Sequence, residues 1–241
     1  MKSVYAGLCV GNLAPGRATE FLAKVLFFKP NNRPTITLLH FVNGMFQLSI
    51  TIVFGLIALI FKFDPGNELS SGQFLLIGIF CMLLLAFFML FILKFNSLQK
   101  WLFSLFKKTL SAHSLPYSFT KSSVRTLFLF SIIRYAVFTT QFVLILKLFY
   151  SGPLNSSIFA SVCVYFLLTT ILPMISFIEP AIRAAIAVLV FGGTEINEIS
   201  LVTTAILVWL INIVLPSIFG YIIIVKEKFN PDSNWDSLFK K

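Results

Sequence analysis

Hydrophobic residues along this chain gather in long runs that short polar turns separate. Turn-forming clusters at residues 64–67 and 151–153 mark the ends of two of these runs. A helix needs about 20 consecutive apolar residues to cross a bilayer. We expect a membrane-spanning helix over each of the four longest runs, residues 35–61, 73–93, 124–146 and 201–225.

Two proline-centred breaks interrupt the remaining apolar sequence. The first, residues 12–20, follows an apolar piece too short to span. The second, residues 172–183, separates an apolar segment over 156–171 from a half-length segment over 180–191. Paired broken segments in two halves of a membrane protein are typical of a transport site between repeats. We therefore expect an all-α polytopic membrane protein, a helical bundle with two broken or re-entrant segments and a possible inverted repeat.

Composition supports a membrane protein. The chain is 58% hydrophobic and 12% charged, whereas a soluble domain is typically about 25% charged. The net charge of +10 is concentrated in the loop 94–125 and in residues 17–33, while acids occupy other loops. This is the positive-inside pattern, so the partners that we expect are anionic membrane lipids and not nucleic acid. The loop 94–125 and the C-terminus are predicted to be cytoplasmic.

This topology places both ends of the segment 156–191 on the outer side. The segment is then either a re-entrant hairpin or a full hairpin, with its tip between Pro173 and Pro180. Non-helical backbone at membrane depth is tolerated only inside protein or along a wet cavity. We expect the tip to line such a cavity.

The second break carries a pair of opposite charges. Ser176 and Glu179 fit a capping box, with Pro180 in the first turn of a new helix. Arg183 follows Glu179 by four residues, so the two side chains can pair along one helix face. The alternative is a purely structural ion pair, although charges within the membrane are usually functional.

The first break also combines a proline, an arginine and a glutamate. Asn12 is expected to cap a helix that runs to about residue 28, with Pro15 in its first turn and Gly16 beside it. Arg17 and Glu20 lie three apart and can share a face. A helix N-terminus with an arginine suits a phosphate or carboxylate. Arg17 is equally well explained as an anchor that reaches the interface.

The predicted spans contain few other polar residues. Arg134 and Gln141 lie seven apart in the third span, on one face; Arg134 should face protein or water, and Gln141 alternatively bonds a neighbouring helix. Pro216 predicts a kink in the last span. His40 is interpreted as a helix-end residue. No metal-ligand spacing, cofactor motif or catalytic motif is found, so we expect neither an enzyme nor a cofactor.

With both breaks placed, the chain resembles the flippase-like family, the transmembrane region of lysylphosphatidylglycerol synthase/flippase proteins. Residues 15–20 resemble the family segment P-G-R-x-G-E, with Thr19 in place of glycine, and Pro173, Glu179 and Arg183 resemble its later segment, whose glycines are missing here. The resemblance implies a bacterial inner-membrane protein. Family members normally have further spans before this segment, so we expect N-terminal spans to be missing here, and we expect a stand-alone member without the synthase domain.

The resemblance and the charges together predict translocation or binding of phospholipid or lipid-linked headgroups. Residues 1–228 would form the transmembrane domain and residues 229–241 a polar cytoplasmic tail. One alternative is a membrane-embedded transferase or its accessory subunit, with a partner transferase or a second copy of the chain. Another is a scaffold without transport. The expected substrate-binding residues are Arg17, Glu20, Arg134, Glu179 and Arg183.

Overall fold

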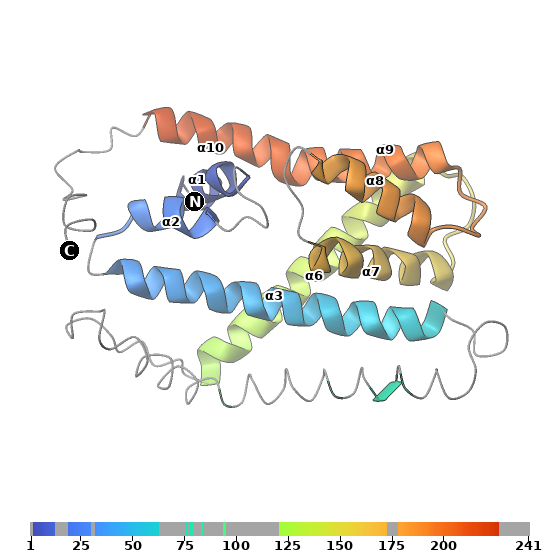
Figure 1. Cartoon of the computed structure of the whole chain (residues 1–241), viewed down its shortest axis with the longest axis horizontal. Coiled ribbons are helices and arrows are strands. Elements are labelled where there is room, and N and C mark those ends of the chain that lie inside the picture. Colours follow the sequence, from blue (N-terminus) through green and yellow to red (C-terminus); the bar gives the residue numbers. More distant parts are fainter. Residues whose placement is uncertain are drawn as a thin grey trace.

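The computed structural model describes residues 2–12, 19–29, 32–62, 121–172 and 178–226, with a few single positions between 76 and 94. Throughout this part of the chain the regular structure is helical (Figure 1). In chain order the helices are α1 (Lys2–Gly11), α2 (Glu20–Leu26), α3 (Arg33–Lys62), α6 (Lys121–Phe149), α7 (Ser156–Ile171), α8 (Glu179–Val190), α9 (Glu198–Trp209), the π-helix η3 (Leu210–Val214) and α10 (Leu215–Lys226).

Three stretches are long and apolar enough to cross a membrane: Ile36–Lys62, Ser122–Phe149 and Glu198–Lys226. They correspond to three of the four predicted spans. The fourth, residues 73–93, lies mostly outside the described residues, as do the loop 94–125 up to Lys121 and the tail after residue 226. The expectation of an all-α membrane protein is confirmed.

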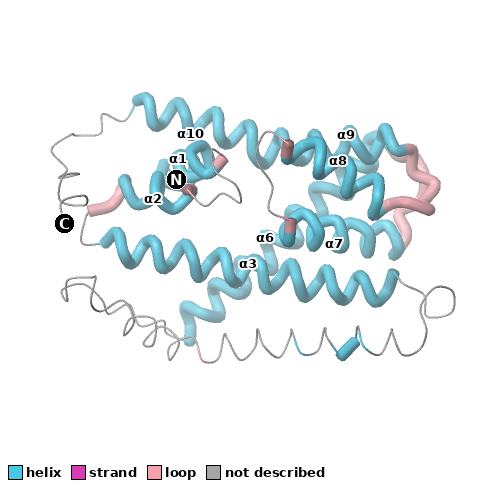
Figure 2. Tube along the Cα trace, in the orientation of Figure 1, coloured by secondary structure: helices cyan, strands magenta, loops and turns pink. Residues whose placement is uncertain are grey.

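The ends of the long helices agree with the predicted topology. In Figure 1 the start of α3, the start of α6 and the end of α10 lie towards one side of the molecule. The end of α3 lies on the opposite side, together with the loops that follow α6 and α8 (Figure 2). The segment between those two loops, residues 156–191, therefore starts and finishes on one side, as the charge pattern predicts.

The two pairs of short helices occupy opposite halves of the molecule. Helices α1 and α2 lie between the first half of α3 and α10, whereas α7 and α8 lie beside the second half of α3 and α9 (Figure 1). At about 1.5 Å per residue, α7 is about 24 Å long and α8 about 18 Å. Both are shorter than the roughly 30 Å hydrocarbon core. Of the two predicted forms, these lengths favour the re-entrant hairpin.

The largest buried cluster lies where α6, α7, α8 and α9 meet. Phe142 and Tyr165 are fully buried, and their ring centroids are 4.8 Å apart. Phe191 stacks on the other side of Phe142 at 6.0 Å. A much smaller cluster, around Val42 and Phe46, joins the first half of α3 to α6. The aromatic cluster thus fixes the α7–α8 hairpin, and the α1–α2 end has less core to hold it.

The first break differs from its prediction. The backbone N–H of Asn12 donates to the carbonyl of Leu8 at 3.2 Å, so Asn12 continues the hydrogen bonds of α1 and does not cap the next helix. That helix, α2, begins only at Glu20, and its N-cap is Thr19. The expected start at Asn12 is therefore wrong, because α1 packs along α10 and remains helical through Gly11.

The second break is partly as predicted. Helix α7 covers Ser156–Ile171, the range expected, and α8 has Pro180 in its first turn. The N-cap of α8, however, is Ile178, and no side chain caps it. Ser176, the other member of the predicted capping box, lies outside the described residues. Glu179 stands at the first position of α8, where its carboxylate accepts hydrogen bonds from Arg183, one turn later.

The last span changes its hydrogen-bond pattern in the middle. A single stretch of π-helix, η3, lies between α9 and α10 and ends two residues before Pro216. Proline lacks an N–H and its ring clashes with the carbonyl four residues earlier. The predicted disturbance at Pro216 is thus present as a π-bulge, a feature found often at functional sites.

Candidate functional site

Glu179 and Arg183 form the ion pair that the sequence predicts. One carboxylate oxygen of Glu179 accepts from Nε of Arg183 at 2.9 Å and from a terminal guanidinium nitrogen at 2.8 Å. Glu179 is only 6% exposed. The fully buried Tyr165 of α7 lies close to both side chains. This pair therefore lies between α8 and the aromatic cluster.

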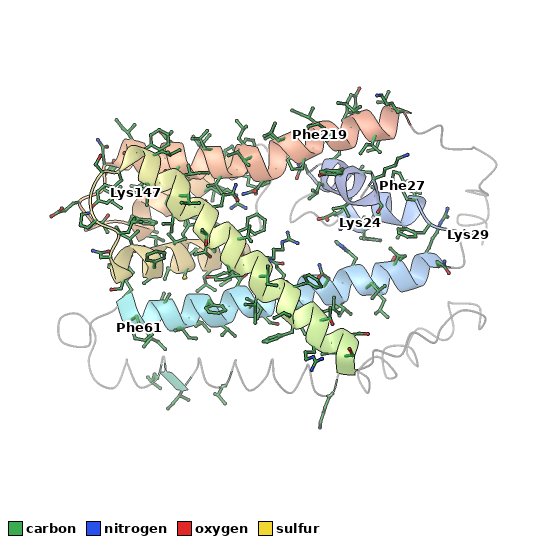
Figure 3. The ribbon with its side chains drawn as sticks, turned by 180° about the vertical axis from the view of Figure 1, so that it is seen from behind. Lys24, Phe27, Lys29, Phe61, Lys147 and Phe219 are labelled. Carbon is green, nitrogen blue, oxygen red and sulfur yellow. The ribbon has the colours of Figure 1, made fainter. Side chains whose placement is uncertain are left out.

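A second ion pair, between Glu20 and Lys24, lies on α2. Glu20 Oε1 accepts from Nζ of Lys24 at 2.6 Å, again with a spacing of four residues. The same ammonium is 3.1 Å from Nδ1 of His40 on α3. Figure 3 shows Lys24 on α2, which lies between α3 and α10. Glu20, Lys24 and His40 form one hydrogen-bonded chain, which we call the α2–α3 triad.

Arg134 stands near the middle of α6. It lies within electrostatic range of Glu20, and its guanidinium carbon is 5.4 Å from the ring centroid of Phe138. The side chain is exposed, and among the described residues its guanidinium has no hydrogen bond or ion pair. Arg134 is therefore close enough to Glu20 to be affected by its charge, although no ion pair joins these two described side chains.

A cavity of about 410 Å³ is lined by residues of α1's end, the start of α8 and the last span. Asn12 reaches it from the end of α1 and Glu179 from the start of α8, and η3 with α10 forms the remaining wall. Nδ2 of Asn12 donates to Ser217 Oγ at 2.5 Å. The lining residues are Asn12, Glu179, Trp209, Ile213, Val214, Ser217, Ile218 and Tyr221. One described residue of each break, Asn12 and Glu179, therefore lines the same cavity.

Several predicted site residues lie outside the described part of the chain: Pro15, Gly16, Arg17, Pro173 and Ser176. For Gln141 the alternative of a bond between helices is confirmed, because its Oε1 accepts from Nδ2 of Asn212 in η3 at 2.9 Å. Among the described residues no cluster has the ligands that a metal ion needs.

Sequence reasoning missed two cations, Lys24 and Lys62, and the contact that His40 makes with Lys24. Lys24 follows Glu20 by four residues, so the spacing rule applied to Glu179 would also have found it. His40 lies seven residues after the start of α3, near that end of the helix, and only its contact with Lys24 was not foreseen. Nζ of Lys62 donates to Ser161 Oγ at 2.9 Å and to the carbonyl of Val190 at the end of α8. Lys62 directly follows an apolar run and gave no sign in the sequence that it turns inward.

The fold and this interior define a helical membrane protein with a charged centre. No family model matches the chain, and no curated protein or solved structure shows significant similarity to it.

Proposed function

We propose that this protein binds the anionic headgroup of a phospholipid or lipid-linked molecule in its interior and passes it between leaflets, as the resemblance to the flippase-like family implies. One observation carries the proposal: Arg134 is a cation at membrane depth, and no carboxylate among the described residues pairs with it. A charge in the membrane is costly unless it meets a partner or water.

The balance of charges in this region is positive. Each of the two interior acids already bonds a cation four residues away, Glu20 to Lys24 and Glu179 to Arg183. We therefore expect Arg134 to pair with an anion that is not part of the protein. A phosphodiester fits, because guanidinium pairs with phosphate through parallel hydrogen bonds.

The cavity supports an amphiphilic ligand. Its apolar wall on α10 includes Ile218 and Tyr221, which are 51% and 63% exposed. Asn12, Ser217 and Glu179 give the same cavity a polar side. A lipid chain would lie along α10 and its headgroup would turn towards the interior charges. Glu20 and Glu179 would then position the arginines or meet a cationic part of the headgroup.

The distribution of lysine and arginine also bears on how the protein would be oriented in the membrane. With residues 94–125 and the C-terminus in the cytoplasm of a bacterial inner membrane, α1 and α2 would approach the centre from the cytoplasmic side, and α7 and α8 from the outer side. Substrate would then be exposed to each leaflet in turn between two short hairpins.

The test is headgroup translocation in vesicles. Purified protein is reconstituted with fluorescent phosphatidylglycerol, and the inner-leaflet fraction is measured by chemical quenching from outside. Arg134→Gln should lower the rate at least about tenfold, because a lost charge-assisted contact is worth about 1.5–3 kcal/mol.

The matched control is Lys147→Gln. Lys147 is a cation on the same helix, but it lies at the far end (Figure 3) and bonds the carbonyl of Gly152. Its replacement should leave the rate unchanged. An unchanged rate in Arg134→Gln, with normal folding, would remove Arg134 from the function.

One observation favours the scaffold alternative: Gln141 and Asn212 bond two helices together. The two ion pairs, Glu20–Lys24 and Glu179–Arg183, do not support the scaffold alternative. In each pair the carboxylate and the cation lie on the same helix, so the bond between them does not join two helices. A scaffold predicts no translocation by the unmodified protein in the same vesicles.

A further inference from the structure

The α2–α3 triad contains a titratable group that headgroup binding alone does not require. We propose that His40 takes up a proton when the anion binds near Arg134, so that binding is linked to protons. This inference rests on the proposed function, because it concerns the same interior site.

The geometry assigns the starting state of His40. The ammonium of Lys24 can only donate, and it lies 3.1 Å from Nδ1 of His40. Nδ1 is therefore the acceptor, and the imidazole is neutral with its proton on Nε2. Lys24 thus spans two acceptors, the carboxylate of Glu20 at 2.6 Å and the imidazole.

Protonation of His40 would break its contact with Lys24. A proton on Nδ1 removes the acceptor, so Lys24 and His40 repel each other, and Lys24 keeps only Glu20. The triad then changes from neutral to a net charge of +1. Arg134, within electrostatic range of Glu20, brings the local charge to +2. An anion that binds between Arg134 and Lys24 relieves this repulsion.

The surrounding elements contribute few other charges. Helix α2 brings Glu20 and Lys24 to His40. Helix α6 brings Arg134 towards Glu20 and carries Lys121 and Arg125 near its start, where it packs against this part of α3. Helix α7, which also packs on α3, carries no charged residue. His40 lies seven residues after the start of α3, about 10 Å along the helix, within the apolar span. A proton entering there with an anion leaves the total charge in the membrane unchanged.

The test measures binding as a function of pH. Protein in phosphatidylcholine nanodiscs is titrated with labelled phosphatidylglycerol between pH 5.5 and 8.5, a range over which the phosphodiester stays ionised. Affinity should fall as pH rises, by up to about tenfold per pH unit for one linked proton. His40→Gln should make affinity nearly independent of pH. His113→Gln, which replaces the only other histidine in the chain, should keep the full dependence.

The outcomes separate the two proposals. Binding that needs Arg134 but does not vary with pH overturns the role of His40 and leaves the proposed function intact. A pH dependence that survives in His40→Gln also overturns it, because another group is then titrating. Absence of binding at every pH overturns both proposals. If His40→Gln does not fold, the imidazole of His40 is followed by NMR in the unmodified protein, assigned with His113→Gln. A ring that fails to titrate when lipid is bound or removed contradicts the inference.

Discussion

The two interior ion pairs have the same spacing and different surroundings. Glu179 and Arg183 lie next to Tyr165 and the aromatic cluster that fixes α7 and α8. Glu20 and Lys24 lie on the short helix α2, of which Ala23 is the only residue described as buried. Lys24 also bonds His40, so its ammonium has a second acceptor. The first pair is held by packing, whereas the second can exchange partners, and the exchanging pair lies beside Arg134.

The largest difference should appear when each carboxylate is neutralised. Glu179→Gln leaves Arg183 largely buried without its charge partner, and removing one member of a buried pair costs about 3 kcal/mol or more. Glu20→Gln should cost less, about 1 kcal/mol, because Lys24 keeps its bond to His40. Thermal unfolding in detergent measures both. Equal losses in the two variants would show that the pairs are held alike.

Glycine substitutions in α3 compare the packing of the two ends. A Cβ on Gly55 would lie 2.5 Å from Cβ of Leu167 on α7, a contact that side chains do not tolerate. Gly55→Ala should lower the free energy of unfolding by about 1–3 kcal/mol. At Gly44, towards the α2 end, a Cβ meets nothing within 4 Å. Gly44→Ala should be neutral or stabilising by up to about 1 kcal/mol, since alanine favours helix. A destabilised Gly44→Ala would contradict the open space beside this position of α3.

The apolar pattern predicted the described helices well. The range 156–171 was correct at both ends because Asn155 precedes it as a helix cap, accepting from the N–H of Ile158 at 3.0 Å. The spacing of Glu179 and Arg183 was sufficient to predict their bond, because neighbours on a helix face are set by local geometry alone.

Contacts between distant segments were not predictable from local patterns. The end of α1 at Asn12 depends on its packing against α10, 205 residues away at the Asn12–Ser217 bond. The inward turn of Lys62 depends on the carbonyl of Val190, and the position of His40 in the triad depends on how α2 lies on α3. Each of these contacts joins segments that are distant in the sequence, so it can be inferred only once the fold is known.

The central claim is that Arg134 meets the anionic part of a lipid in the interior. Native mass spectrometry of the purified protein, released from mixed micelles with equal phosphatidylglycerol and phosphatidylcholine, measures this directly. The unmodified protein and Lys147→Gln should retain phosphatidylglycerol preferentially, and Arg134→Gln should lose that preference. Equal retention of phosphatidylglycerol by Arg134→Gln and the unmodified protein would contradict the claim.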